Sequence, residues 1–258
     1  MPKDELIMAG RHFESRFLLG TGKFGSKDEM KRAIDDSGTE IVTVALRRID
    51  LDRSEENILS FIPEHITLVV NTSGARNAKE AVRIARIAKE AGYGNWVKIE
   101  VISDSRYLLP DNAETIKATE VLASEGFIVL PYMHPDLYVA RDLVKAGASA
   151  VMPLGSLIGS NQGIKMRTLI EVLIEEVDKV PIIVDAGIGR PSHAAEAMEM
   201  GADAVLVNTA VATAGDPVRM ATAFAKAIDA GRIAYLAGQA REQHGSSASS
   251  PLTGYLFE

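Results

Sequence analysis

The sequence contains no cysteine and only one tryptophan, and 5% of its 258 residues are aromatic. Without cysteine the chain can build neither a disulfide framework nor a thiolate metal site, and a cysteine nucleophile is excluded. The five histidines are scattered, and none forms an HxH or HExxH spacing, so no metal site is predicted. The composition fits a reducing compartment, and we expect a cytoplasmic protein.

The sequence also lacks a basic excess and a long apolar run. Its net charge is −7 and its isoelectric point is near 5.4, which argues against nucleic acid as a partner because a phosphate backbone attracts basic surfaces. No run approaches the roughly 18 apolar residues of a membrane span. Residues 1–13 mix charged and apolar residues, so no secretory signal is expected. We therefore expect neither nucleic acid nor membrane among the partners.

The sequence does contain a regular alternation of strand and helix patterns. Short apolar runs alternate with segments whose apolar residues recur at helical spacing. The predicted strands cover residues 17–20, 41–46, 67–71, 96–101, 127–132, 150–154, 181–185 and 204–208. The predicted helices cover residues 27–37, 54–61, 78–91, 137–146, 165–177, 193–200 and 218–230, with a further helix opened by Pro110-Asp111 and stopped by Gly126. Ser192 is the predicted cap of the helix at 193–200.

Eight alternating units in one chain of this length predict an α/β protein with a single-domain (β/α)8 TIM barrel of eight parallel strands. A doubly wound open sheet also alternates strand and helix and is the main alternative. The count of eight favours the barrel, which we assign to residues 1–240. Residues 241–258 are rich in serine and have no periodicity, so they are predicted to form a flexible C-terminal tail that orders only against a partner.

The strand at 96–101 differs from the other apolar strands because it carries two charges on one face. Val97 and its alternate neighbours point one way, whereas Trp96, Lys98 and Glu100 point the other way. If this strand lies among strands buried on both faces, an ammonium and a carboxylate face the protein interior. Such burial is costly unless the charges are paired or used in function.

Polar residues follow several of the predicted strands, where a (β/α)8 enzyme places its active site. They are Thr21-Gly22-Lys23, Asn71-Thr72-Ser73, Lys98 with Glu100, the loop 155–163, Asp185, and Asn208-Thr209. The glycine-containing turn after the strand at 181–185 and the turn after the strand at 204–208 fall where barrels of this kind bind phosphate. The alternative is that both segments are only tight turns.

Lys98 has three interpretations: a salt-bridged core lysine, a charge that binds substrate, or an amine nucleophile. Desolvation favours a neutral amine, which can attack a ketone or aldehyde and form an imine. Glu100 lies two residues on, about 7 Å along the strand, close enough to move protons around an imine. Asp185, which ends a strand across the predicted barrel, would be a second acid–base group.

Eight collinear motifs, from about Phe17 to the C-terminus, resemble those of the bacterial thiazole synthase family of thiamine biosynthesis. They are Gly20-Thr21-Gly22-Lys23-Phe24, Asn71-Thr72-Ser73-Gly74, Trp96-Val97-Lys98-Ile99-Glu100, Val151-Met152-Pro153-Leu154-Gly155, Ile158-Gly159-Ser160-Asn161-Gln162-Gly163, Val184-Asp185-Ala186-Gly187-Ile188-Gly189, Ala204-Val205-Leu206-Val207-Asn208-Thr209-Ala210 and Ser250-Pro251-Leu252-Thr253-Gly254.

The resemblance implies a transferase that condenses 1-deoxy-D-xylulose 5-phosphate, dehydroglycine (2-iminoacetate) and sulfur from a carrier-protein thiocarboxylate into thiazole phosphate. The family's imine-forming lysine corresponds to Lys98, and its acid–base pair to Glu100 and Asp185. Its sugar-phosphate contacts correspond to Gly159, Ala186, Gly187, Asn208 and Thr209. No metal or organic cofactor is implied.

The implied partners are the thiocarboxylated sulfur-carrier protein, the dehydroglycine-forming enzyme and further copies of this chain, in a homotetramer or homodimer. Two other interpretations of the residues stay open. One is another lysine-imine barrel acting on a sugar phosphate, such as an aldolase or a pyridoxal-phosphate-forming synthase. The other is a phosphate-binding barrel without catalysis, in which Lys98 and Glu100 form only a core ion pair.

Overall fold

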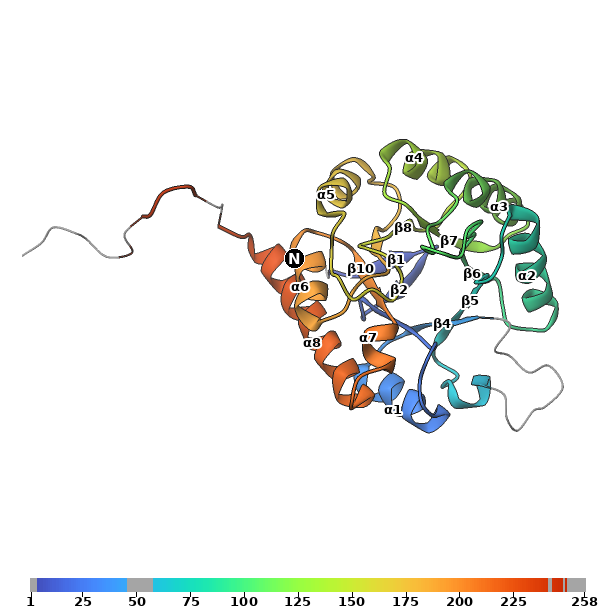
Figure 1. Ribbon diagram of the computed structural model, residues 1–258, viewed down its shortest axis with the longest axis horizontal. Coiled ribbons are helices and arrows are strands. Elements are labelled where there is room, and N and C mark those ends of the chain that lie inside the picture. Colours follow the sequence, from blue (N-terminus) through green and yellow to red (C-terminus); the bar gives the residue numbers. More distant parts are fainter. Residues whose placement is uncertain (1–3, 46–57, 241–242, 248, 250–258) are drawn as a thin grey trace, which may run out of the picture.

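The computed structural model describes residues 4–45, 58–240, 243–247 and 249, and it has the form of one barrel ringed by helices (Figure 1). Its parallel strands are β3 (Phe17–Gly20), β4 (Ile41–Ala45), β5 (Thr67–Asn71), β6 (Trp96–Ile99), β7 (Ile128–Met133), β8 (Met152–Pro153), β9 (Ile183–Val184) and β10 (Ala204–Val207). The helices are α1 (Lys27–Ser37), the 3-10 helix η2 (Ile58–Phe61), α2 (Ala78–Glu90), α3 (Asn112–Ser124), α4 (Leu137–Lys145), α5 (Arg167–Glu176), α6 (Pro191–Glu199), α7 (Thr209–Ala212) and α8 (Pro217–Ala237).

The strands pair in chain order from β3 to β8, and β10 lies between β3 and β9. Two parallel bridges, Val151 with Ile182 and Leu154 with Asp185, join β8 to β9. These bridges bring the two end strands of the sheet together. The predicted barrel of eight parallel strands is thereby confirmed over the doubly wound sheet, whose end strands stay apart.

Helix starts follow the capping residues of the sequence. Ser26, Asn77, Asp111 and Asp216 each accept a hydrogen bond from the backbone N–H three residues on, at the starts of α1, α2, α3 and α8. The predicted cap Ser192 is wrong. Arg190 is the cap of α6, and Pro191 takes the first helical position, which its fixed φ suits.

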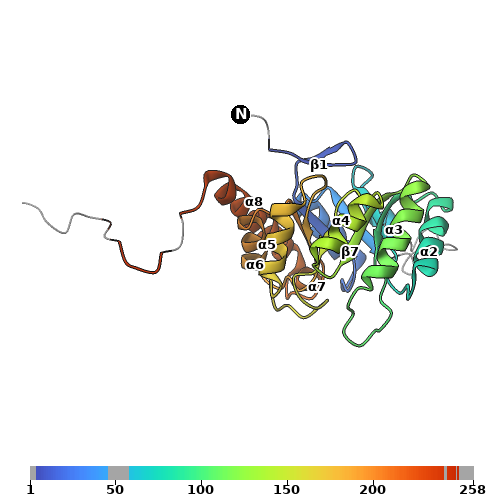
Figure 2. The ribbon, with the colours of Figure 1, turned by 90° about the horizontal axis from the view of Figure 1, so that it is seen from above.

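An N-terminal hairpin closes one end of the barrel. It was not predicted from the sequence. The strands β1 (Leu6–Met8) and β2 (Arg11–Phe13) pair around Ala9-Gly10, both at positive φ. Leu6, Met8 and Phe13 are buried in one cluster with inward-facing residues of the barrel strands. Figure 2 shows β1 at one end of the barrel and α7 at the opposite end.

The outward faces of the strands form a second layer of core against the helices. Val97, Ile99 and Val101, for example, pack with Ala81, Ala118 and other apolar residues of α2 and α3. Because side chains alternate along a strand, this packing turns Trp96, Lys98 and Glu100 to the barrel interior. The two-faced strand predicted at 96–101 is therefore present in the fold.

Some predictions fall wholly or partly on residues outside the described ranges. The last residue of the strand predicted at 41–46 and the first part of the helix predicted at 54–61 lie there, whereas the last part of that helix is η2. Most of the predicted tail, 241–258, also lies outside, and the tail residues that are described are exposed. Within the described part of the chain, no helix is both long and apolar enough to cross a bilayer.

Candidate active site

A cavity of about 630 Å³ opens at the end of the barrel where the strands finish. The eight residues predicted for the site all line it: Lys98, Glu100, Asp185, Gly159, Ala186, Gly187, Asn208 and Thr209. They come from β6, from the residue that follows it, and from the segments after β8, β9 and β10. Residues separated by as many as 111 positions in the sequence are thus brought to one cavity, although their chemical roles stay predictions.

Lys98 and Glu100 are both buried at the inner wall of this cavity, with 5% and 7% of their surface exposed. Their burial follows from the alternation along β6, whose other face is occupied by the packed Val97 and Ile99. A one-residue shift in register would expose these apolar residues to the interior polar groups and bury the charges against the helices. The apolar face therefore fixes the direction of both charged side chains.

Lys98 forms a buried ion pair with Asp185 rather than with its strand neighbour Glu100. The two partners come from β6 and from the residue after β9, so the pair spans the barrel interior. Burial raises the pKa of the Asp185 carboxyl, against the lowering effect of the Lys98 ammonium. A carboxylate with a raised pKa can accept a proton from the ammonium, which leaves the neutral amine that nucleophilic attack requires.

Glu100 is held by β5 instead. Its Oε2 accepts a hydrogen bond of 3.0 Å from Asn71 Nδ2. Its backbone N–H donates to Thr72 Oγ1 at 2.9 Å, and the same hydroxyl donates to the Glu100 carbonyl at 3.2 Å. These contacts fix one carboxylate oxygen and the backbone of Glu100, so its position at the cavity wall is set by the neighbouring strand.

Tyr132 of β7 lies beside Lys98 and was not predicted as a site residue. It is 1% exposed, its hydroxyl has no hydrogen-bond partner among the described residues, and Lys98 Nζ lies 5.3 Å from the centre of its ring. Burial raises the pKa of this phenol, and the carboxylates of Asp185 and Glu100 raise it further, so it stays protonated. Its place could have been found from strand parity, because Tyr132 shares the inward face of β7 with Leu130.

The loop after β8 is fastened to the segment after β9 by backbone hydrogen bonds. The N–H groups of Gly155 and Gly163 donate to the carbonyls of Asp185 and Gly187, both at 2.8 Å. Gly187 has φ of 77°, and a Cβ there would lie 1.8 Å from Ser156 Oγ. Glycine at this position is thus required both by the backbone conformation and by the close approach of the two segments.

Asn208 follows β10 and lies against the end of β3. A Cβ on Gly20 would lie 2.6 Å from Asn208 Cβ, and one on Gly22 would lie 2.7 Å from its Nδ2. The two glycines therefore make the space that the amide side chain occupies. Asn208 Oδ1 is buried without a hydrogen-bond partner among the described residues, so an acceptor remains free beside the cavity.

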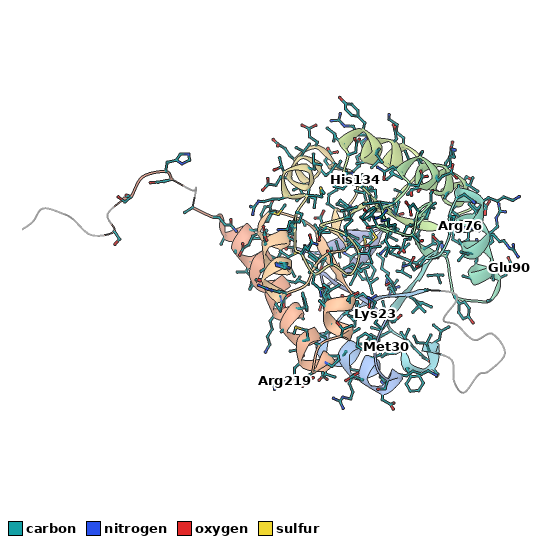
Figure 3. The ribbon with its side chains drawn as sticks, viewed as in Figure 1. Lys23, Met30, Arg76, Glu90, His134 and Arg219 are labelled. Carbon is teal, nitrogen blue, oxygen red and sulfur yellow. The ribbon has the colours of Figure 1, made fainter. Side chains whose placement is uncertain are left out.

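Lys23 also reaches this part of the cavity; from the sequence it was named only as one of the polar residues that follow the strands, without a role in binding. Its Nζ lies 3.4 Å from Thr209 Oγ1, and a Cβ added to Gly159 would lie 3.5 Å from the same nitrogen. Figure 3 shows Lys23 toward the middle of the ring of helices, whereas Arg219 lies at its outer edge. The signal in the sequence was its place directly after the first strand of the barrel, within a glycine-containing turn.

His193 makes a local contact with the turn that precedes α6. Its Nδ1 accepts a hydrogen bond from the Gly189 N–H at 3.2 Å. Burial and the nearby Arg190 lower its pKa, so the neutral imidazole that this bond needs is favoured. Among the described residues, no group of three His, Cys, Asp or Glu side chains has the arrangement of a metal site.

A family model for the thiazole biosynthesis protein ThiG matches residues 7–251. The chain belongs to this family. Its similarity to ThiG proteins covers nearly the full length: it is 64% identical over 254 residues to the thiazole synthase of Pelotomaculum thermopropionicum, covering 98% of this chain and 99% of that one. It is 62% identical over 253 residues to the thiazole synthase of Clostridioides difficile, with 98% of each covered. The predictions of the family and of an enzyme of thiazole formation are confirmed.

Solved structures support the same fold. A chain of the Amycolatopsis orientalis BexX/CysO complex is 34% identical, with a TM-score of 0.83 over 93% of this ThiG-family chain and 98% of that one. A mandelate oxidase solved with benzaldehyde is 20% identical, with a TM-score of 0.63 over 90% and 78% of the two chains. At that identity the second likeness extends to the barrel fold alone.

Proposed function

We propose that this protein forms thiazole phosphate from 1-deoxy-D-xylulose 5-phosphate, dehydroglycine and carrier-bound sulfur, through an imine on Lys98. The observation that carries the proposal is the buried Lys98–Asp185 pair at the wall of a cavity. A pair with only a structural role has no need of a cavity beside it. The sequence similarity to thiazole synthases supports the substrates.

The first step is attack of the Lys98 amine on the ketone carbon of the sugar, after the ammonium has given its proton to Asp185. The carbinolamine then loses its oxygen as water, with the proton supplied by Asp185. The raised pKa of Asp185 suits both transfers, because burial makes this carboxylate bind a proton more readily than an exposed one. The product is an imine between Lys98 and the former carbonyl carbon.

Glu100 removes a proton from the carbon next to the imine, which gives an enamine, and the carbonyl is thereby moved along the sugar. Its fixed position against Asn71 supports this role because a general base must be oriented toward the proton that it takes. Sulfur then arrives from the carrier thiocarboxylate, and dehydroglycine closes the ring with loss of water. Imine formation activates the sugar without a metal.

The phosphate group is proposed to bind at Gly159, Ala186, Gly187, Asn208 and Thr209. Their common position on the cavity wall, where glycine leaves the backbone open to a ligand, supports binding of a polar group there. Holding the phosphate would fix the ketone near Lys98. Such positioning contributes up to about 7 to 11 kcal/mol in well-oriented reactions.

The thiocarboxylated carrier is proposed to bring its C-terminal tail to the open mouth of the cavity. The relative BexX is known in a complex with CysO, which supports a protein partner on this barrel. The proposal also includes contact with the dehydroglycine-forming enzyme, assembly into a homotetramer or homodimer, and a cytoplasmic location. Light scattering decides the number of copies.

Borohydride trapping tests the central step. Incubation with 1-deoxy-D-xylulose 5-phosphate and borohydride is expected to add the mass of the reduced sugar phosphate to the peptide that contains Lys98. In a separate reaction without borohydride, a carrier protein ending in a Gly-Gly thiocarboxylate should yield thiazole phosphate when the sugar phosphate and dehydroglycine are present. Folded protein that forms no adduct at saturating sugar phosphate contradicts the imine. An adduct without use of the carrier would point to an aldolase-like barrel.

A further inference from the structure

Lys23 holds a backbone conformation that is unfavourable for a residue with a side chain. Its φ is 70°, in the left-handed region that glycine adopts freely. The next residue, Phe24, is partly buried and packs against the core cluster that includes Phe17 and Met30. This packing holds the end of the turn in place. The turn thus has a lysine at a position where glycine would adopt the same backbone conformation with a smaller loss of free energy.

The ammonium of Lys23 lies where three segments after barrel strands converge. It is 3.4 Å from Thr209 Oγ1 of the segment after β10. A Cβ on Gly159, in the loop after β8, would lie 3.5 Å from it, so the lack of a side chain at Gly159 leaves room beside the charge. Lys23 itself follows β3. An ammonium, a hydroxyl and an open backbone are therefore grouped at one part of the cavity.

Lys23 differs from the other cations of this cavity in its partners. Lys98 is paired with Asp185, and Arg76 lies 3.7 Å from Glu80. Within the described ranges no carboxylate lies within ion-pair distance of Lys23. A cavity that already holds Glu100 and Asp185 repels an anion unless a cation compensates. Lys23 is the cation placed to do so.

We infer that Lys23 binds the phosphate of the sugar phosphate and determines that the substrate must be phosphorylated. The inference rests on the proposed function and adds to it a charged residue. An ammonium on a flexible stem suits a phosphate as a point charge with several donors. Thr209 Oγ1, 3.4 Å away, would share the same phosphate oxygens. The backbone contacts shape the site, and Lys23 supplies its charge.

The test compares 1-deoxy-D-xylulose 5-phosphate with unphosphorylated 1-deoxy-D-xylulose in borohydride trapping at Lys98. In Lys23→Met, the concentration of the phosphorylated sugar that gives half-maximal adduct should rise about 10- to 100-fold, the usual loss for a hydrogen bond to a charged group. The value for the unphosphorylated sugar should not change. Lys23→Arg should recover most of the loss. Lys31→Met is the matched control, because Lys31 pairs with Asp35 away from the cavity.

Lys23→Gly separates binding from folding. Glycine fits a φ of 70° without strain, so the melting temperature of the Lys23→Gly variant should not fall. The affinity of this variant for the sugar phosphate should fall as in Lys23→Met. Equal losses for both sugars would overturn the inference in favour of a structural role. No loss for either sugar would show that Lys23 does not bind the phosphate.

If the wild type forms no adduct with either sugar, the proposed imine fails, and calorimetry decides about Lys23 separately. Titration of the sugar phosphate, and of inorganic phosphate as a competitor, is then compared between wild type and Lys23→Met. Weaker binding in the variant supports the inference. Equal dissociation constants contradict it.

Discussion

The two ends of the barrel contain different kinds of residues. At the hairpin end, Phe13 is 1% exposed and lies edge-on to Trp96 with ring centres 5.8 Å apart, and the cluster around it is apolar. At the cavity end the wall carries Lys98, Glu100 and Asp185. β6 spans both ends, from Trp96 to Lys98. We therefore expect substitutions at the hairpin end to lower mainly the free energy of unfolding, and substitutions at the cavity end to lower mainly turnover.

Lys98→Ala should have the largest effect and separates chemistry from stability. Loss of the amine should remove the borohydride adduct and lower turnover by at least about 10³-fold, as for other residues that form the covalent bond. The fold should persist, because the raised pKa of Asp185 lets its carboxyl become neutral once the ammonium is gone. Trapping, turnover and thermal unfolding measure the three quantities.

Lys145→Ala is the control for that variant, because Lys145 pairs with Asp142 on the surface of α4 and its side chain is 76% exposed. It should leave adduct, turnover and melting temperature unchanged. Near-normal turnover in Lys98→Ala would show that the buried lysine is not the nucleophile. A variant that fails to fold would show instead that the cavity end also determines stability, and the proposed division between the two ends would be wrong.

Phe13→Ala should have the opposite effect to Lys98→Ala, because it should lower stability and leave turnover near normal. Removal of a fully buried aromatic side chain leaves a cavity and should lower the free energy of unfolding by about 3–5 kcal/mol. Turnover per folded molecule should stay near normal below the melting temperature, because the site residues lie at the other end. Denaturant unfolding and turnover at low temperature measure these quantities. Ile7→Ala, on the same hairpin but 48% exposed, is the matched control and should change neither.

The sequence predicted the faces of the strands better than the pairs that form between them. Alternation along β6 placed Lys98 and Glu100 in the interior because the opposite face is apolar over several residues. It could not show that Lys98 pairs with Asp185 and that Asn71 holds Glu100. Those partners depend on how the closed barrel staggers its strands, which no local pattern contains.

Short elements were missed for a related reason. β1 and β2 have three residues each and α7 has four, too few for a hydrophobic period to be recognised. Ala9-Gly10 between two alternating segments was the available sign of the hairpin. Lys23 was noted only as polar, because its φ and its approach to Thr209 are properties of the folded turn.

Asp4→Asn should have the smallest effect, and it tests how the hairpin end is held to the barrel. Asp4 accepts hydrogen bonds of 2.9 and 2.8 Å from Arg232 of α8, and it lies 3.0 Å from the buried Arg16. The partly exposed pair is screened by solvent, so we expect a loss of about 1 kcal/mol at neutral pH, with turnover unchanged.

The loss of stability in Asp4→Asn should depend on pH. The hydrogen bonds from Arg232, with the charge of Arg16, hold the pKa of Asp4 below its ordinary value of 3.8. A carboxyl with a lowered folded-state pKa stabilises the fold above its unfolded pKa, and this stabilisation is lost as the pH falls through the lower value. The difference in unfolding free energy between wild type and Asp4→Asn should thus be constant from about pH 5 to 7 and shrink below about pH 4. Urea unfolding across this range measures it. A difference that stays constant to pH 2.5 would mean that the carboxylate charge has no part in fastening the hairpin, and that apolar packing around Phe13 holds that end alone.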